Sequence, residues 1–436
     1  MQDYTINTSY MHPISPLSLS HARQFIIADT YARYLKILGY KVTKPVIFHY
    51  SGRTAERIIE SIKTYFANGK KAEKGSKVWV LKNVYKIPDS ILEIMDNPIK
   101  LLDYFSTEQL QNLRKLGIFI DSDYTYNTKL VEYEDFVRQI YNTYRSLGLL
   151  CKNLERCAIC YNNPAWSSKA IAQLNETLFI GPNIKPLILA ALKFLADIKD
   201  GWLFEREGGT GVCINCKIIE PMSDSELISM FDSIKNNLKL PLDIFFMEEH
   251  LKIWIAKKIY SEVAILPPEK RTKTYFITGM IKSIEVDYGN DIRYKIKLPY
   301  LLDRYDPIII RLAMLICAEP GNNFIWNNEI LNSASKFLKR YQKFQGYCKT
   351  LPKCKNAEAD EIINSSLNTI FGYISKGLFR HAILEALQGM PEKLRKINLS
   401  NGCGFLIDKY DEIIKYLFVL DSEQLTGAKI PQVLFL

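Results

Sequence analysis

YMHPISPLSLSHARQFIIADTYARYLKILGYKV, residues Tyr10–Val42, predicts a Pro/Ser-rich loop followed by one long helix. Ser18 or Ser20 is a suitable N-cap, and Gly39 suits the left-handed position after a helix end. The apolar residues of this segment recur at helical spacing, at Phe25, Ala28, Ala32, Leu35 and Leu38. The helix start, with His21 in its first turn, offers unpaired N–H groups and a positive dipole to a phosphate or carboxylate. An ordinary capped core helix is the alternative.

The composition indicates a globular protein of two or three domains. The chain has 436 residues, of which 47% are hydrophobic and 24% are charged, so it can bury a sizeable core. Its formal net charge of +10 permits an anionic partner such as RNA without requiring one. The start MQDYTINTSY does not read as a signal sequence, and no apolar run reaches the roughly 18 residues of a membrane helix. We therefore expect a cytoplasmic protein without a membrane partner.

Strand-like and helical segments alternate in the first part of the chain. KPVIFHYSG, residues Lys44–Gly52, predicts a short buried strand, and an amphipathic helix follows it. KVWVLKNVY, residues Lys77–Tyr85, predicts a second strand or extended segment. From Pro88 to Leu149 the pattern is mostly helical. This β-α-β beginning predicts an α/β fold.

Two CxxC pairs indicate a metal site. The pairs are Cys157–Cys160 and Cys213–Cys216, and 52 residues separate them. Two such knuckles supply four thiolates in the tetrahedral arrangement that structural zinc requires, and an odd total of nine cysteines argues against a secreted disulfide framework. The alternative is four unrelated buried thiols, because neither pair is followed by the glycine that commonly relaxes a knuckle.

A basic helical segment lies in the last third of the chain. Between Ser335 and Lys355 there are seven basic residues and no acidic ones, with aromatic residues interleaved. We assign RNA contact to Lys336, Lys339, Arg340 and Lys343, because phosphate neutralisation and base stacking need this mixture. A basic helix face with its aromatic residues turned inward is the alternative. The partner expected is tRNA or another RNA, with a protein partner as a further alternative and no DNA.

The helix start resembles a known family. PxSPLSLSHAR followed by DxxARYLKxLGYKV is similar to the first signature of the class I aminoacyl-tRNA synthetases, and specifically of the archaeal type of leucyl-tRNA synthetase. Later segments resemble the same family in the same order, at Val78–Leu92, Pro241–His250, Val263–Lys270, Ile277–Ile281 and Asp303–Ile330. The resemblance spans nearly the whole chain.

The resemblance implies an architecture. It is a split Rossmann-type parallel sheet with a zinc-bearing insert, followed by an all-α bundle of the anticodon-binding type. The implied ranges are 1–150 and 221–318 for the two halves of the nucleotide-binding domain, 151–220 for the zinc-knuckle insert and 319–436 for the bundle. Lys44–Gly52 and Thr274–Ile281 are expected in one sheet. The insert is too short for the editing domain of the leucine enzymes, so a truncated paralogue without editing is implied.

The first catalytic motif of the family is degenerate in this chain. In His-x-Gly-His both imidazoles contact phosphate, and the glycine lets adenine lie against the backbone. Here Ser18 and Ser20 replace the first histidine and the glycine, while His21 remains. His12 stands where the family places an aromatic residue beside the amino-acid pocket. The resemblance therefore leaves His12 and His21 as the candidate ligand-binding residues.

The second motif, Lys-Met-Ser-Lys-Ser, is also degenerate. Its place falls at Asp287–Asp291, where two acids replace two bases that would hold pyrophosphate. The nearby Arg293, Lys295 and Lys297 are candidate substitutes, although their alternation suggests one face of a strand. Because losing one preorganised donor costs about 2.7 to 4 kcal/mol, leucine activation is expected to be lost.

Two functions remain open on this basis. The first is a pseudo-synthetase without leucine activation or editing, which carries structural zinc and binds tRNA, another RNA or a protein. The second is a divergent active class I ligase, which activates leucine or another acid with ATP and keeps His21 as its phosphate contact. ATP is a cofactor only if that histidine still serves a phosphate.

Overall fold

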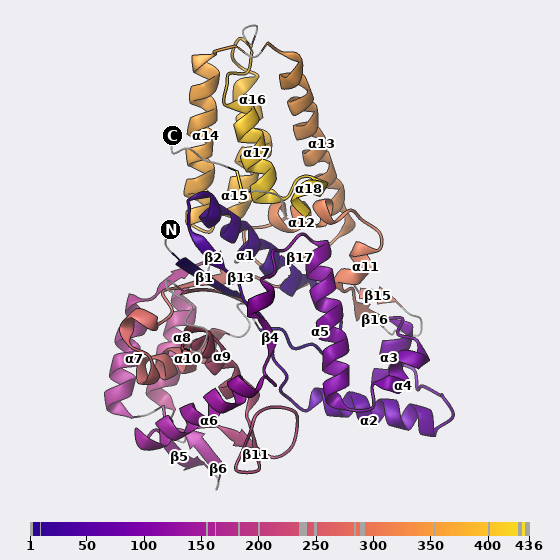
Figure 1. Cartoon of the computed structure of the whole chain (residues 1–436), viewed down its shortest axis with the longest axis vertical. Helices are drawn as coiled ribbons and strands as arrows, with labels where there is room; N and C mark the ends of the chain where they lie inside the picture. Colours follow the sequence, from indigo (N-terminus) through magenta and orange to yellow (C-terminus); the bar gives the residue numbers. More distant parts are fainter. Residues whose placement is uncertain are drawn as a thin grey trace.

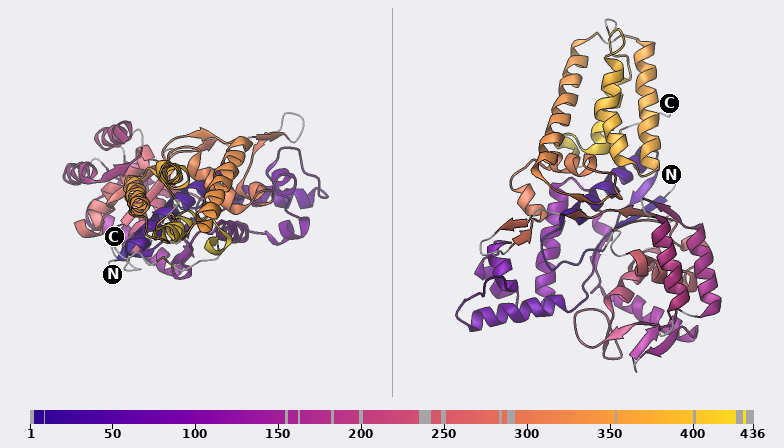
Figure 2. Two further views of the ribbon diagram at one scale, coloured as in Figure 1. Left: turned by 90° about the horizontal axis from the view of Figure 1, so that it is seen from above. Right: turned by 180° about the vertical axis from the view of Figure 1, so that it is seen from behind.

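The structure, a computed structural model, has a parallel sheet at its centre, a helical bundle on one side and a second helical layer on the other (Figures 1 and 2). It describes residues 3–8, 10–153, 156–161, 163–181, 184–198, 201–234, 242–247, 251–282, 285–287, 293–352, 354–399, 402–425 and 430–431.

The main sheet has five strands, all parallel. Their order is β2 (Lys41–Thr43), β1 (Asp3–Thr8), β12 (Leu242–Met247), β13 (Thr274–Thr278) and β7 (Leu178–Ile180). The neighbours β1 and β12 come from opposite halves of the chain, since Thr5 pairs with Leu242. The predicted parallel sheet, built from two separate parts of the sequence, is confirmed.

The predicted strand at Lys44–Gly52 exists but lies outside this sheet. It is β3 (Val46–Phe48), which pairs in parallel with β4 (Thr125–Asn127) in a separate two-stranded sheet. The prediction that it shares a sheet with Thr274–Ile281 is therefore wrong. Pro45, which has no amide hydrogen, separates β3 from the edge strand β2, so the chain leaves the main sheet there.

Different helices cover the two faces of the main sheet. Phe245 and Phe276 belong to the apolar cluster that contains α1 (Leu19–Ile37) and the bundle. Ile244 and Tyr275, which alternate with them, belong to a second cluster on the opposite face. That face is covered by α7 (Pro164–Glu176), α8 (Ile184–Asp197), α9 (Pro221–Ile234) and α10 (Leu251–Ile265).

The helix α1 begins and ends as its sequence predicts. Ser18 is its N-cap, and Gly39, just beyond the C-cap, has φ +86°, which an L side chain rarely adopts. The helix is buried around nearly its whole circumference, because the sheet lies on one side and the bundle on the other. Its polar residues, among them Arg23 and Asp29, therefore need partners inside the protein.

A helical arm follows β3. It consists of α2 (Thr54–Ala67), α3 (Lys77–Asn83), α4 (Asp89–Ile94) and α5 (Pro98–Lys115), and α6 (Val131–Ser146) comes after β4. The prediction of a strand at Lys77–Tyr85 is wrong, because α3 occupies this segment. The Ser76 side chain accepts the Trp79 N–H and starts the helix, while Val78 and Leu81 supply its buried side.

The predicted insert range, 151–220, divides between two places. Its strand β7 joins the main sheet. Its helices α7 and α8 cover one face of that sheet. The other strands form two antiparallel three-stranded sheets. One contains β5 (Leu150–Asn153), β6 (Arg156–Ile159) and β8 (Trp202–Leu203), and the other contains β9 (Glu205–Arg206), β10 (Cys213–Ile214) and β11 (Lys217–Ile219). Two backbone hydrogen bonds, of 2.9 and 3.0 Å, join Gly52 and Thr210 and so fix the insert to the residues after β3.

The C-terminal part is helical. The segment before it contains β14 (Ile281–Lys282), β15 (Glu285–Asp287), β16 (Arg293–Lys295), α11 (Leu298–Leu302) and α12 (Pro307–Ile316), with β17 (Phe324–Ile325) pairing with β14. The bundle is built from α13 (Asn328–Thr350), α14 (Ala357–Ser375), α15 (Phe379–Leu384), α16 (Met390–Leu394), α17 (Ile407–Phe418) and α18 (Ser422–Leu425). Within the described ranges, no helix combines the length and apolar character needed to cross a membrane.

Candidate functional site

Ser18 closes the start of α1. Its Oγ accepts the backbone N–H of His21 at 3.2 Å and lies 2.7 Å from Nδ1 of the same residue. The N–H of Leu298 donates to the carbonyl of Leu17 at 2.8 Å, so the start of α11 covers this loop. One N–H group of the helix end is therefore satisfied by Ser18, and the same hydroxyl holds the imidazole.

Ser20, which replaces the glycine of the family motif, bonds to the neighbouring strand β14. Its Oγ accepts the N–H of Ile281 at 2.9 Å and lies 3.4 Å from the carbonyl oxygen of that residue. The residue is buried, with 6% of its surface exposed. The hydroxyl thus fills the contact between α1 and β14, where the resemblance places adenine.

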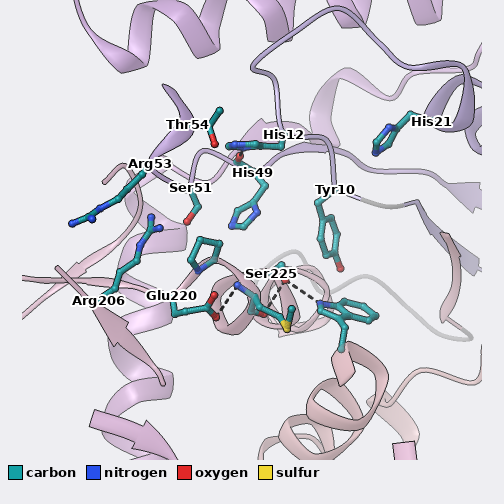
Figure 3. Close-up of a pocket in the computed structure, with 14 residues that line it drawn as sticks. Tyr10, His12, His21, His49, Ser51, Arg53, Thr54, Arg206, Glu220 and Ser225 are labelled. Carbon is teal, nitrogen blue, oxygen red and sulfur yellow. Dashed lines mark hydrogen bonds between the residues drawn. The ribbon is translucent and has the colours of Figure 1, made fainter. Parts of the chain in front are cut away.

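A cavity of about 480 Å³ lies beside the start of α1 (Figure 3). Its walls come from the loop before α1, the residues after β3, the insert, and the starts of α9 and α10. The polar side chains that line it are Tyr10, His12, His21, His49, Ser51, Arg53, Thr54, Arg206, Glu220 and Ser225. The structure therefore brings His12 and His21, the two ligand candidates from the sequence, to one cavity.

His12 and His49 lie next to one another in this cavity. The His12 Nδ1 is 2.9 Å from the carbonyl oxygen of His49, so this nitrogen carries the hydrogen and Nε2 is the acceptor. Burial lowers the pKa of His12 to about 4, which makes the ring neutral at pH 7. The His49 Nε2 lies 2.9 Å from Asp224, which also accepts the Tyr133 hydroxyl at 2.7 Å. His49 is thus oriented by a buried carboxylate, while His12 can accept a hydrogen bond from a ligand.

Two arginines lie at the end of the cavity away from His21 (Figure 3). Arg53 donates to the backbone carbonyl of Glu207, and Arg206 donates to that of Thr210 at 3.2 Å. Burial lowers the pKa of Arg206, although a guanidinium keeps its charge at pH 7. The cavity is therefore basic at one end.

The sequence gives a weak signal for several of these residues. His49 and Arg53 follow a predicted strand end, where functional side chains often lie, and Arg206 opens the glycine-rich stretch REGGTG. The Gly52–Thr210 backbone bonds and the bond from Arg53 to Glu207 bring the two arginines together. These segments are about 150 residues apart in the sequence, and neither contains a pattern that predicts contact with the other.

The four predicted zinc ligands are not brought together. Cys160 is bonded to Cys151, while Cys157, Cys213 and Cys216 are free. Within the described ranges, no group of three or more His, Cys, Asp or Glu side chains is placed to hold a metal ion. The residues in this arrangement do not fit a zinc ion.

Zinc binding by the four cysteines stays a prediction from their spacing. Elemental analysis of the purified protein tests it, with one zinc per chain expected if the two knuckles close on a metal. Zinc should then be absent from the variant Cys213→Ser/Cys216→Ser and kept in Cys317→Ser, which alters a cysteine outside the CxxC pairs. A metal content near zero in the unmodified protein would contradict the prediction.

The place of the second catalytic motif is described only in part. Asp287 ends β15, and residues 288–291 lie outside the described residues. Lys295, on β16, is exposed, whereas the backbone of Lys297 forms an isolated antiparallel β-bridge with Ser18 at the start of α1. Burial lowers the pKa of Lys297. Of the three candidate substitutes, Lys297 is the one whose backbone lies at the degenerate first motif, but its side chain lines a separate cavity together with Lys295.

The candidate RNA-binding residues form one solvent-facing side of α13. Lys336, Lys339, Arg340 and Lys343 are all exposed, and none forms an ion pair within the described part of the chain. Tyr341 and Phe344, which alternate with them, are buried in the bundle. Base stacking by these two aromatic residues is therefore ruled out, while Tyr347, with 47% of its surface exposed, remains available.

Comparison with curated proteins gives a partial match. Leucine–tRNA ligase 1 of Sulfurisphaera tokodaii is 32% identical over 157 residues, which are 36% of this chain and 16% of that protein. The leucine–tRNA ligase of Methanopyrus kandleri is 29% identical over 162 residues, with the same coverage of both chains. The matches thus span about one sixth of the length of these relatives. No family model matches the chain.

Comparison with solved structures covers nearly the whole chain. The methionyl-tRNA synthetase of Mycobacterium tuberculosis in complex with methionyl-adenylate has a TM-score of 0.69 at 12% identity, over 99% of this chain and 92% of that one. The Agrobacterium radiobacter LeuRS-tRNA-LeuAMS complex has a TM-score of 0.67 at 9% identity, over 99% and 86%. At these identities the likeness establishes the fold.

Proposed function

We propose that this chain, a leucyl-tRNA synthetase-like protein with the class I synthetase fold, has lost leucine activation and acts by binding tRNA or another RNA. The observation that supports the loss of leucine activation is the Ser20 hydroxyl, which bonds to Ile281 where the resemblance places adenine. A nucleotide would have to displace this buried contact. Ser18, in the place of the first histidine, is already engaged as the cap of α1.

Leucine-dependent ATP–pyrophosphate exchange by the purified protein is expected at background. Stabilising charge on a phosphate needs preorganised donors, and the first motif keeps His21 alone while two acids occupy the second. The assay should include a leucyl-tRNA synthetase as positive control. Exchange well above background with leucine would overturn the loss of activation.

The proposed RNA binding rests on the basic side of α13. Its exposed cations project from one side of α13 and form no ion pair with acids among the described residues, which leaves them available for phosphate contact. The same surface is less suited to a protein partner, because lysine is depleted at protein–protein interfaces. This favours RNA over protein.

Reversing two of these charges, in Lys339→Glu/Arg340→Glu, is expected to weaken binding of bulk tRNA by roughly tenfold or more at about 0.1 M salt. Removing two phosphate interactions should also reduce the slope of log affinity against log salt by about 2. Filter binding over a salt series measures both. Lys63→Glu, at an exposed position on α2, is the matched control and should change neither. Equal affinity in the double variant and the unmodified protein would sink the assignment.

A divergent ligase is the second candidate, and the cavity supports it. A volume of about 480 Å³ with His12, His49 and His21 along its length can hold a small acid beside the start of α1. In that case, exchange should appear with an acid other than leucine, and His21→Ala should abolish it. Exchange across the amino acids separates the two candidates.

A further inference from the structure

The basic end of the cavity has three donors. Arg53 and Arg206 approach it from the start of α2 and from β9, and the Ser51 hydroxyl lies beside them (Figure 3). Neither arginine forms an ion pair within the described ranges, and each donates to a backbone carbonyl instead. Two guanidinium groups held close together repel one another unless an anion lies nearby.

Two donors at this end lack a protein partner. The Ser51 Oγ and the Arg206 Nε are buried, and neither has a hydrogen-bond partner among the described residues. Ser51 as a whole is 2% exposed. Leaving a buried donor unsatisfied costs about 1 to 3 kcal/mol, so such atoms usually mark a place where a ligand supplies the acceptor.

Two acids near the cavity accept hydrogen bonds from residues other than the arginines. The Glu220 carboxylate accepts the backbone N–H groups of Met222 and Ser223, each at 3.0 Å, and the indole N–H of Trp202 at 3.3 Å. Asp224 accepts from His49 and from Tyr133. Glu220, Glu56 and Asp224 lie close enough to attract Arg206, but among the described residues none of them forms an ion pair with either arginine.

The glycine-rich turn of the insert holds the two arginines in place. An added Cβ at Gly209 would lie 2.7 Å from the Arg206 Nη2 and 3.2 Å from the Arg53 Cγ. Gly208 and Gly209 have φ of +66° and +103°, so glycine is required there for conformation as well as for space. The backbone bonds between Gly52 and Thr210 fix this turn against Ser51. The three donors are thus held in a preorganised arrangement.

We propose that this end of the cavity binds the side-chain carboxylate or the phosphate group of a small acid, held by Ser51, Arg53 and Arg206. The neutral His12 Nε2 accepts from a donor elsewhere on the same molecule. A ligand with an aliphatic side chain such as leucine would leave both guanidinium groups desolvated and unpaired, so it is disfavoured. The site goes beyond the proposed RNA function and holds whether or not RNA binds to α13.

Isothermal titration of the full-length protein at constant ionic strength tests the site with defined probes. L-Glutamate represents a side-chain carboxylate, and inorganic phosphate represents a free phosphate. L-Glutamine and L-leucine, which share the α-carboxylate of glutamate but have uncharged side chains, are the neutral controls. We expect at least one of the two anions to bind about tenfold or more tightly than either control. Whichever anion binds identifies the chemical source of the charged group.

Variants then locate the binding. Arg206→Gln and Ser51→Ala should each weaken binding of that anion by about tenfold, the usual effect of losing a hydrogen bond to a charged group. Arg53→Gln changes an exposed side chain, so its effect is measured on a folded protein even if the half-buried Arg206 is needed for stability. Arg114→Gln, exposed on α5, is the matched control. Equal affinity for acids and their neutral analogues, or unchanged anion binding in both Arg53→Gln and Arg206→Gln, would overturn the proposal.

Discussion

Replacing Asp29 by asparagine is expected to lower the free energy of unfolding by about 3 to 5 kcal/mol, the usual effect of removing one member of a buried ion cluster. The Asp29 carboxylate is fully buried and lies 2.8 Å from Arg33, 3.2 Å from Lys44 and 3.0 Å from Arg311. It also accepts the backbone N–H of Phe119 at 2.9 Å. The variant would leave three cations in the interior without their common counter-ion. Urea unfolding at pH 7 measures the loss.

The same residue predicts a pH dependence. Burial alone would raise the pKa of Asp29, but the adjacent cations outweigh it and hold the pKa well below its ordinary value. The stability that Asp29 contributes is therefore fully present above the unfolded pKa, near 3.9, and is lost as the pH falls below it. The difference between Asp29→Asn and the unmodified protein should shrink between about pH 5 and pH 2.

Asp96→Asn is the control for this prediction. Asp96 forms an ion pair of 2.7 Å with Lys100, but both side chains are more than half exposed, so little change is expected. If Asp29→Asn unfolded at the same urea concentration as Asp96→Asn, the cluster would contribute no more than a surface pair. The prediction would then be wrong.

Replacing Arg23 by methionine should have an effect of similar size, about 3 to 5 kcal/mol, for a different reason. The Arg23 guanidinium is buried and donates to a series of backbone carbonyls. These acceptors are Met314, Ala318, Glu319, Pro320 and Asn322, at 2.7 to 3.2 Å. They belong to the end of α12 and to the turn before β17, so the side chain holds this turn against α1.

The conservative variant separates charge from geometry. Arg23→Lys keeps the charge, but a single ammonium cannot reach five carbonyls spread over a turn, so we expect most of the loss to remain. Arg114→Met, at an exposed position on α5, should change the midpoint of thermal unfolding little. A midpoint for Arg23→Lys equal to that of the unmodified protein would show that charge alone matters.

Local features of the fold can be read from the sequence. Ser18 and Gly39 bound α1 as predicted, because capping and left-handed termination depend on a few adjacent residues. The prediction that Lys44–Gly52 belongs to the main sheet is wrong, because the sequence of a strand does not determine which other strand it pairs with. The segment after Ser76 is a helix rather than a strand, because a cap and two inward apolar residues outweigh the preference of its valines and tryptophan for strands.

The candidate site can be predicted from the sequence only in part. His12 and His21 follow from the resemblance of the first motif, and both line the cavity. Arg206 and Ser51 do not, since their proximity depends on how the insert docks against the end of β3. The sequence does not decide whether Tyr341 and Phe344 face RNA or the interior of the bundle, because the basic and aromatic residues of that helix follow similar spacings. In the structure both are buried.

The adjacency of β1 and β12 also constrains how the protein is made. Thr5 can pair in the sheet only after Leu242 has been synthesised. Asp29 can form its ion pair with Arg311 only after Arg311 has been synthesised. At roughly 5 to 20 residues per second, translation of the intervening chain takes on the order of 10 to 50 s. During this interval the apolar surface of α1 has neither the central strands nor the bundle to cover it. The N-terminal half is therefore expected to expose apolar surface during synthesis, and it should reach its native contacts only after the second half has been synthesised.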